Sequence, residues 1–373
     1  MISISKERES VSPLPASKDI PSGNSRLRVL FARLVIGLIV FICAEVFSGA
    51  SLRLGLWNPW TILVTYWLYF AHFFFFTTLA VRTGRTSLSS LYLWGVLFGL
   101  YESWITKVVW SGYGGGTFAM GHIGPYGFSE ISMVFFYHPV VSFILPLAVA
   151  CLLCPPLRRL FPELGWFTGK NRGARFAQVY LVLSFATVMG MNSGGPVNLA
   201  LNLAAAIILL LVLLRLAQPA LAAMGGRSIV VFGRWGFGAL CVYLTMLYGV
   251  SYFAIRPEGL PSIAVQLFTF VFYALAIAGL WLHRRRKPLG VDGVSVEKRE
   301  LRLVLWLFAG LVALGFAISI FGLNPVLELF IVLNFVVWTP SGFVFAALAL
   351  VMGVREYLSG RANRVEADPS TAE

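Results

Sequence analysis

Residues 261–287, PSIAVQLFTFVFYALAIAGLWLHRRRK, show the pattern that sets the class of this protein. It opens with a proline, continues with about 20 mostly apolar residues and closes on consecutive basic residues. A helix of that length rises about 1.5 Å per residue and spans the roughly 30 Å hydrocarbon core of a bilayer. Proline suits the first helical turn, and basic residues concentrate in cytoplasmic loops. The stretch therefore predicts a transmembrane helix that runs from the outside to the cytoplasm.

Apolar stretches of similar length recur along the whole chain of 373 residues. The composition is 58% hydrophobic and 12% charged, which excludes an ordinary soluble domain because such a domain could not bury so much apolar surface. We predict an all-α, polytopic membrane bundle of about ten transmembrane helices. The expected spans are residues 29–50, 58–81, 87–110, 129–153, 175–193, 196–216, 229–254, 261–283, 301–321 and 325–354.

The distribution of basic residues predicts the orientation of this bundle. Of the 29 lysines and arginines, Arg53 and Arg256 fall on one side and Lys107 lies inside a span, so the other 26 share the opposite side. Because basic loops stay in the cytoplasm, we predict an inner (plasma) membrane protein with both termini cytoplasmic. The net charge of +13 follows from this topology, so we expect no nucleic-acid partner.

The chain ends and one loop differ in composition from the spans. Residues 1–27 and 357–373 are polar, and we expect them to be disordered cytoplasmic tails around a single transmembrane domain at 28–356. The run SGYGGGTFAMGHIGPYGFS at 111–129 is rich in glycine and aromatic residues and almost uncharged. It is too apolar for a solvated loop, which favours a re-entrant segment over a plain surface loop.

Ionisable residues inside the spans gather in the half predicted to face outward. Each costs about 2.5–3.5 kcal/mol in hydrocarbon, so their position carries information. We expect the buried carboxylates to act as acid or base and Lys107 to hold an anionic group. The alternative is that the lysine pairs with Glu45, Glu130 or Glu328 to fix helix packing. The catalytic candidates are Glu45, Glu102, Lys107, Glu130 and His138.

Further polar and aromatic residues near the same face are candidates for binding substrate. The asparagines have an alternative role as hydrogen-bonding contacts between helices, and the tryptophan as part of an interfacial aromatic belt. The substrate-binding candidates are Trp110, Asn192, Asn198, Asn202, Glu328 and Asn334.

Motifs that would name a reaction are absent from the sequence. It has no P-loop, no H-E-x-x-H and no G-x-S-x-G, and its lone C-x-x-C at Cys151 and Cys154 predicts no metal site. The sequence identifies no cofactor and leaves the oligomeric state open. We expect the lipid bilayer itself to be the partner. We also expect the protein to be a membrane-embedded enzyme or lipid-handling protein, with a polar pocket in the outer half of the bilayer that takes a lipid or small amphiphile. A secondary transporter or channel, and a non-catalytic scaffold, are the alternatives.

Overall fold

The computed structural model describes residues 23–50, 58–113, 118, 120–223, 226–289, 296–322 and 324–367. The outer parts of both predicted tails, residues 1–22 and 368–373, lie outside the described residues, as do residues 114–117 and 119 of the predicted re-entrant run.

Helices make up almost all of the described structure. The elements are α1 (Gly23–Phe41), η1 (Ile42–Val46), η2 (Thr61–Thr65), α2 (Tyr66–Thr83), α3 (Leu88–Thr106), α4 (Val108–Ser111), β1 (His122–Ile123), β2 (Tyr126–Gly127), η3 (Met133–Ile144), α5 (Leu145–Leu153), α6 (Pro155–Arg158), η4 (Pro162–Thr168), α7 (Arg172–Asn192), α8 (Pro196–Ala223), α9 (Gly226–Val230), α10 (Arg234–Ala254), η5 (Pro257–Gly259), α11 (Ile263–Leu282), α12 (Lys298–Phe321) and α13 (Pro325–Ala367).

The all-α membrane bundle is confirmed. Within the described residues, nine helices are long and apolar enough to cross a membrane, and each coincides with a predicted span. The remaining predicted span, 87–110, corresponds to α3, whose residues are mostly buried by neighbouring helices. Helix α3 carries several serines and Glu102, and its enclosure by protein lets those polar groups find partners away from lipid.

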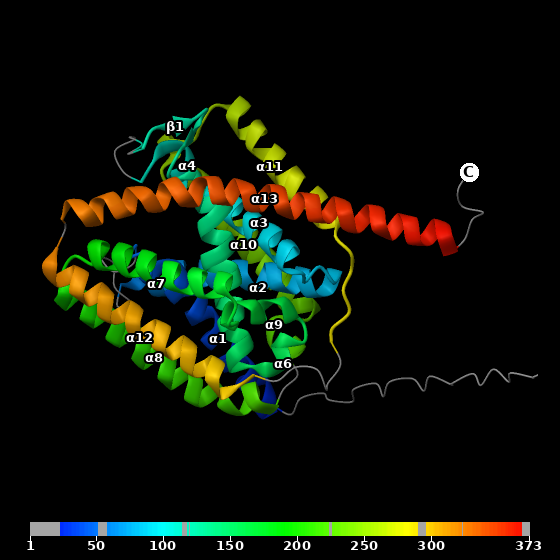
Figure 1. The fold of residues 1–373 in the computed structure, drawn as a ribbon, viewed down its shortest axis with the longest axis horizontal. Helices are drawn as coiled ribbons and strands as arrows, with labels where there is room; N and C mark the ends of the chain where they lie inside the picture. Colours follow the sequence, from blue (N-terminus) through cyan, green and yellow to red (C-terminus); the bar gives the residue numbers. More distant parts are fainter. Residues whose placement is uncertain are drawn as a thin grey trace, which may run out of the picture.

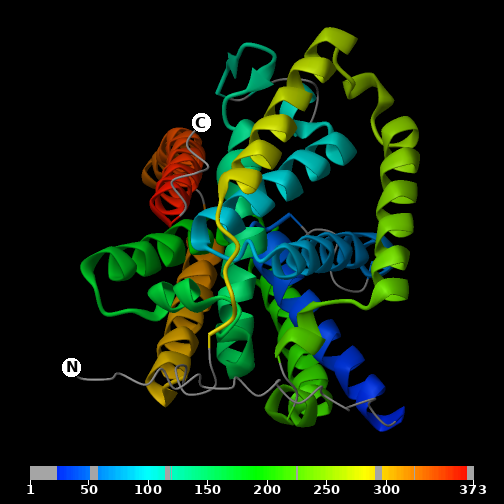
Figure 2. The ribbon, with the colours of Figure 1, turned by 90° about the vertical axis from the view of Figure 1, so that its right-hand side faces the viewer.

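Helix α13 crosses the molecule from one end to the other, and Figure 2 shows it nearly end-on. Figure 1 shows α7 beneath α13, with α8 and α12 running obliquely side by side below α7. Helix α12 packs along α7, and α1 packs along α8. Pro340 does not break α13, which continues past the predicted tail boundary to Ala367.

Connections that the charge pattern assigns to one side meet in the structure. Arg286 forms ion pairs with Glu163 and with Glu356, the latter at 3.3 Å. Its backbone N–H also donates to the carbonyl of Gly84 at 2.7 Å. Three inter-helix connections therefore lie together, as the alternation of spans requires. We call this end of the bundle the basic side and the other end the outer side, after the predicted orientation.

The 111–129 run begins at the last residue of helix α4 and contains a short antiparallel hairpin formed by the two-residue strands β1 and β2. His122 and Ile123 are exposed, whereas Tyr126 and Gly127 are buried against the bundle. The hairpin thus packs on the helices along one strand, and entry into a membrane stays a prediction.

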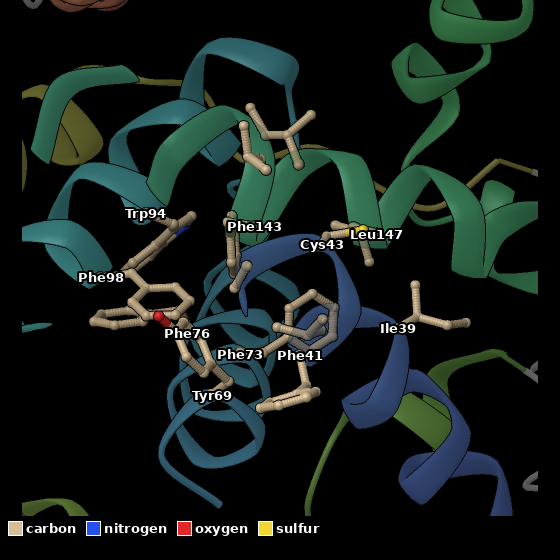
Figure 3. Packing of buried hydrophobic residues seen from close by; sticks show 14 of the residues in the cluster. Ile39, Phe41, Cys43, Tyr69, Phe73, Phe76, Trp94, Phe98, Phe143 and Leu147 are labelled. Carbon is tan, nitrogen blue, oxygen red and sulfur yellow. The ribbon is translucent and has the colours of Figure 1, made fainter. Parts of the chain in front are cut away.

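The core between α2, α3 and η3 is aromatic. Phe73, Phe98 and Phe143 are fully enclosed, and Phe76 and Trp94 pack beside them (Figure 3). Ring centroids lie 5.6 Å apart for Phe73 and Phe143, and 6.4 Å apart for Phe76 and Phe98. We call these five side chains the aromatic layer.

Candidate functional site

Helices α3 and η3 approach each other closely at two glycines. A Cβ on Gly95 would lie 2.4 Å from Pro139 Cα, and one on Gly99 would lie 2.9 Å from the carbonyl oxygen of Val134. Glycines four residues apart let two membrane helices come into backbone contact. The facing element, η3, is a π-helix that contains Pro139, which has no N–H to donate. This contact sets the distance between His138, which precedes Pro139, and Glu102, which follows Gly99 by three residues.

Glu102 and His138 form a hydrogen-bonded pair across this contact. His138 Nε2 lies 3.0 Å from Glu102 Oε2, and His138 Nδ1 lies 3.1 Å from Ser142 Oγ. The side chain of Glu102 is 13% exposed and that of His138 is 3% exposed. Phe98 stacks on the imidazole with its centroid 5.4 Å away. The ring therefore links a carboxylate to a hydroxyl inside an apolar wall.

Tyr69 on α2 joins Glu45 to this pair. Its side chain hydrogen-bonds Glu45 and lies within electrostatic range of Glu102. The Tyr69 and His138 rings are 6.4 Å apart. The structure thus brings together three of the five catalytic candidates, and we call Glu45, Tyr69, Glu102, His138 and Ser142 the polar cluster.

Glu130 lies at the start of the helix that carries His138. It is buried, and its Oε2 accepts a hydrogen bond from Ser129 Oγ at 2.8 Å. A Cβ on Gly127 would lie 2.2 Å from that same oxygen, so the hairpin comes this close because residue 127 is glycine. Tyr113 lies within electrostatic range of both Glu102 and Glu130. The hydrogen bond described for Glu130 is with Ser129, which is outside the polar cluster.

Lys107 is directed elsewhere. Its side chain is fully buried, and Nζ donates to the carbonyls of Ser251 at 2.5 Å, Tyr252 at 3.2 Å and Ile255. These carbonyls end helix α10. The carboxylates proposed from sequence as its partners are not among these contacts, so the geometry gives Lys107 the role of a helix cap.

The asparagine candidates make contacts at helix ends and between helices. Asn192 Nδ2 donates to Ser48 O at 2.9 Å, Asn198 Nδ2 to Ser193 O at 2.6 Å and Asn202 Nδ2 to Asn198 O at 2.9 Å. Asn334 Oδ1 accepts from Tyr180 Oη at 3.0 Å and from Ser184 Oγ at 2.8 Å, which joins α13 to α7. None of these hydrogen bonds reaches Glu102 or His138.

The last two candidates also lie away from the polar cluster's hydrogen bonds. Glu328 is exposed in the first turn of α13. Trp110 is buried with its ring 4.8 Å from that of Trp104. Among the described residues no three His, Cys, Asp or Glu side chains gather as a metal site, and Cys151 and Cys154 are buried free thiols.

Sequence reasoning missed Tyr69 and Ser142. Ser142 follows His138 by four residues, a spacing that places both on one face of a helix. The sequence G-V-L-F-G at 95–99 is a small-x-x-x-small motif and indicates the helix contact that positions Glu102. Nothing in the local sequence distinguishes Tyr69 from the other aromatic residues of α2.

Comparisons with known proteins agree with this architecture. Residues 34–361 match an uncharacterized membrane protein family. An uncharacterized protein of Archaeoglobus fulgidus is 30% identical over 243 residues, which cover 65% of this chain and 74% of that protein. No solved structure matches. The family match covers most of the chain, including the whole polar cluster, so this multi-pass membrane protein belongs to the uncharacterized membrane protein family.

Proposed function

We propose that the protein is a membrane-embedded enzyme that performs acid–base chemistry on an amphiphilic substrate at the polar cluster. The 3.0 Å hydrogen bond between Glu102 and His138 carries this proposal. A carboxylate paired with an imidazole is a common general acid–base device, and ionisable groups are expensive within a membrane.

The difference in exposure between Glu102 and His138 supports a division of roles within the pair. Glu102 is the more exposed member, so its carboxylate is placed to exchange a proton with the substrate or with a water molecule. His138 shares that proton, and Ser142 holds the ring through the other nitrogen. Ser142 is fully buried, which argues against its hydroxyl as the attacking nucleophile of a Ser–His–acid triad.

The aromatic layer favours an enzyme over a transporter or channel. Its members follow Tyr69 on α2, precede Glu102 on α3 and follow His138 on η3, so they lie on the basic side of the pair. A conducting path would need polar groups through that layer, whereas its phenylalanines are closely packed. We infer that a lipid or similar amphiphile reaches the polar cluster from the outer side, because the aromatic layer closes the basic side.

The test is an untargeted search for turnover. We would reconstitute the purified protein in vesicles of a total membrane lipid extract and follow every lipid species over time by mass spectrometry. The wild type should consume or convert one class of lipid. Glu102→Gln and His138→Gln should each slow that conversion about a hundredfold or more, since general acid–base catalysis contributes about 10²–10⁴-fold.

The matched controls replace a glutamate and a histidine that lie on the outer side but outside the polar cluster. Glu258→Gln and His122→Gln change an exposed glutamate and an exposed histidine and should keep the wild-type rate. If all four variants convert lipid at the wild-type rate, the acid–base role is wrong. If the wild type converts nothing while the Glu102 and His138 variants fail to accumulate as folded protein, the polar cluster serves packing and the scaffold interpretation replaces the enzyme.

A further inference from the structure

A cavity of about 770 Å³ opens on the basic side of the bundle. It lies between the end of α5, helix α6, the end of α8 and the start of α12, which Figure 1 shows close together. It shares no lining residue with the polar cluster. It is therefore a second candidate site, independent of the proposed chemistry.

The cavity lies at the ends of three candidate membrane spans. Leu153 is the last residue of one span, Gln218 is the last of another and Lys298 is the first of a third, and all three line the cavity. Span ends lie where hydrocarbon gives way to the polar headgroup region. A ligand in this cavity would meet both environments.

The residues that line the cavity likewise form a charged part and an apolar part. The cationic side chains are Arg159, Arg215 and Lys298, and Glu297 is the acidic one. The apolar part is formed mainly by leucines, two of which, Leu211 and Leu301, are exposed. These are Leu152, Leu153, Leu211, Leu214, Leu221 and Leu301. Such a lining suits a ligand with an anionic head and apolar chains.

The cations of this cavity differ from their neighbours in their pairing. Arg158 forms an ion pair with Glu300 at 2.7 Å, and Arg286 pairs with Glu163 and Glu356. The ion pairs of the described residues include none of the three cavity cations, and Arg159 Nε is buried without a hydrogen-bond partner. A buried guanidinium donor without an acceptor is costly, so an anion that accepts from it would be stabilised.

We propose that this cavity binds the phosphate headgroup of an anionic phospholipid, with its acyl chains along the leucines of α5, α8 and α12. Basic pockets between membrane helices are suited to anionic headgroups. The leucines distinguish this ligand from free phosphate, which has no apolar part to bury.

The experiment measures lipid binding to the full chain in neutral detergent micelles by native mass spectrometry. The probes are dioleoyl phosphatidylglycerol, dioleoyl phosphatidylcholine and inorganic phosphate. The wild type should retain phosphatidylglycerol, bind phosphatidylcholine more weakly and release no phosphatidylglycerol when equimolar phosphate is added. Arg215→Gln/Lys298→Gln should bind phosphatidylglycerol about thirtyfold more weakly, since each basic residue contributes about 1 kcal/mol to such binding.

Arg285→Gln/Lys287→Gln is the matched control. It removes one exposed arginine and one exposed lysine from the same side of the protein but outside the cavity, and it should keep the wild-type affinity. If the two double variants lose the same affinity for phosphatidylglycerol, the lipid binds through general electrostatic attraction to the basic side and not in the cavity. Equal binding of both lipids, or displacement of phosphatidylglycerol by phosphate, would also overturn the proposal. Thermal unfolding without lipid shows that each variant is folded.

Discussion

Lys107 and Arg256 each end one helical segment and donate hydrogen bonds to the end of the other. Lys107 caps α3 and donates to the last carbonyls of α10. Arg256 follows α10 and donates to Thr106 O at 3.3 Å and to Gly112 O at 2.9 Å. Both have positive φ, 56° and 49°, a conformation that costs a non-glycine residue about 1–2 kcal/mol. The reciprocal caps offset that strain by satisfying carbonyls at the ends of α3, α4 and α10.

This relationship predicts that Lys107 and Arg256 serve stability. Lys107→Met and Arg256→Met should each lower the free energy of unfolding by about 2–4 kcal/mol, because buried carbonyls lose charged donors. The double variant should lose less than the sum, since the two caps hold the same helix ends together. Unfolding would be followed by denaturant titration in micelles.

Lys287→Met is the control for removing a lysine, because Lys287 is exposed. Its stability should match that of the wild type. A Lys107→Met protein that is as stable as the wild type but inactive in the lipid-conversion assay would contradict the cap and restore Lys107 as a binding group for an anionic substrate.

The close contact between α3 and η3 yields a second prediction, in which one substitution reduces both stability and activity. Gly95→Ala places a methyl group 2.4 Å from Pro139 Cα, so the helices must separate. Overpacking of this kind costs about 1–3 kcal/mol, and the separation should break the bond between Glu102 and His138. We therefore expect lower stability together with lost lipid conversion.

Gly249→Ala is the control for that substitution. Gly249 lies within α10, and a Cβ there meets nothing within 4 Å. Alanine in an open helical site stabilises a protein by about 0.4–1 kcal/mol, so this variant should be equal to or more stable than the wild type. If Gly95→Ala keeps both stability and lipid conversion, the close helix contact is not what positions the pair.

The spans could be predicted from sequence because hydrocarbon imposes a simple rule on length and apolarity. The same rule made Glu102 and His138 candidates, since ionisable groups in a membrane are rare. Their pairing could not be predicted, because it depends on which faces of α3 and η3 meet. Gly95 and Pro139 set that contact through backbone proximity, which a search for ionisable side chains does not detect.

The role of Lys107 was beyond sequence reasoning for another reason. Its partners are backbone carbonyls 144 to 148 residues away, and a carbonyl leaves no mark in a sequence. The predicted partners are carboxylates, because a sequence shows which side chains are charged but not which backbone carbonyls a cation reaches. The asparagines show the same limit: Asn334 was recognised as polar, but its hydroxyl donors on α7 follow from tertiary packing.

Asn334 yields a third prediction, which separates packing from substrate binding. Asn334→Leu removes the acceptor shared by Tyr180 and Ser184 and should destabilise the protein by about 1 kcal/mol, a usual size for polar contacts between membrane helices. In the Asn334→Leu background, adding Tyr180→Phe should lower the free energy of unfolding only slightly further. Lipid conversion should continue in both variants; its loss from a fully stable Asn334→Leu protein would support the substrate-binding role instead.

The predicted orientation can be tested by cysteine labelling. Three of the four native cysteines are buried, and burial raises the pKa of Cys154 to about 11. At pH 8 about one in a thousand of its thiols is ionised, so it should react slowly until the pH approaches that value. Cys241 is partly exposed and is replaced by alanine to lower the background.

In that background, His122→Cys and Arg285→Cys place an exposed thiol at opposite ends of the bundle. A membrane-impermeant maleimide should label residue 122 in intact cells and residue 285 only after permeabilisation. The reverse pattern would overturn the orientation and move the polar cluster to the cytoplasmic half. The two proposed sites would then exchange leaflets together, because Glu102 and Arg215 lie toward opposite ends of the same bundle, and the amphiphile that reaches Glu102 would come from the inner leaflet.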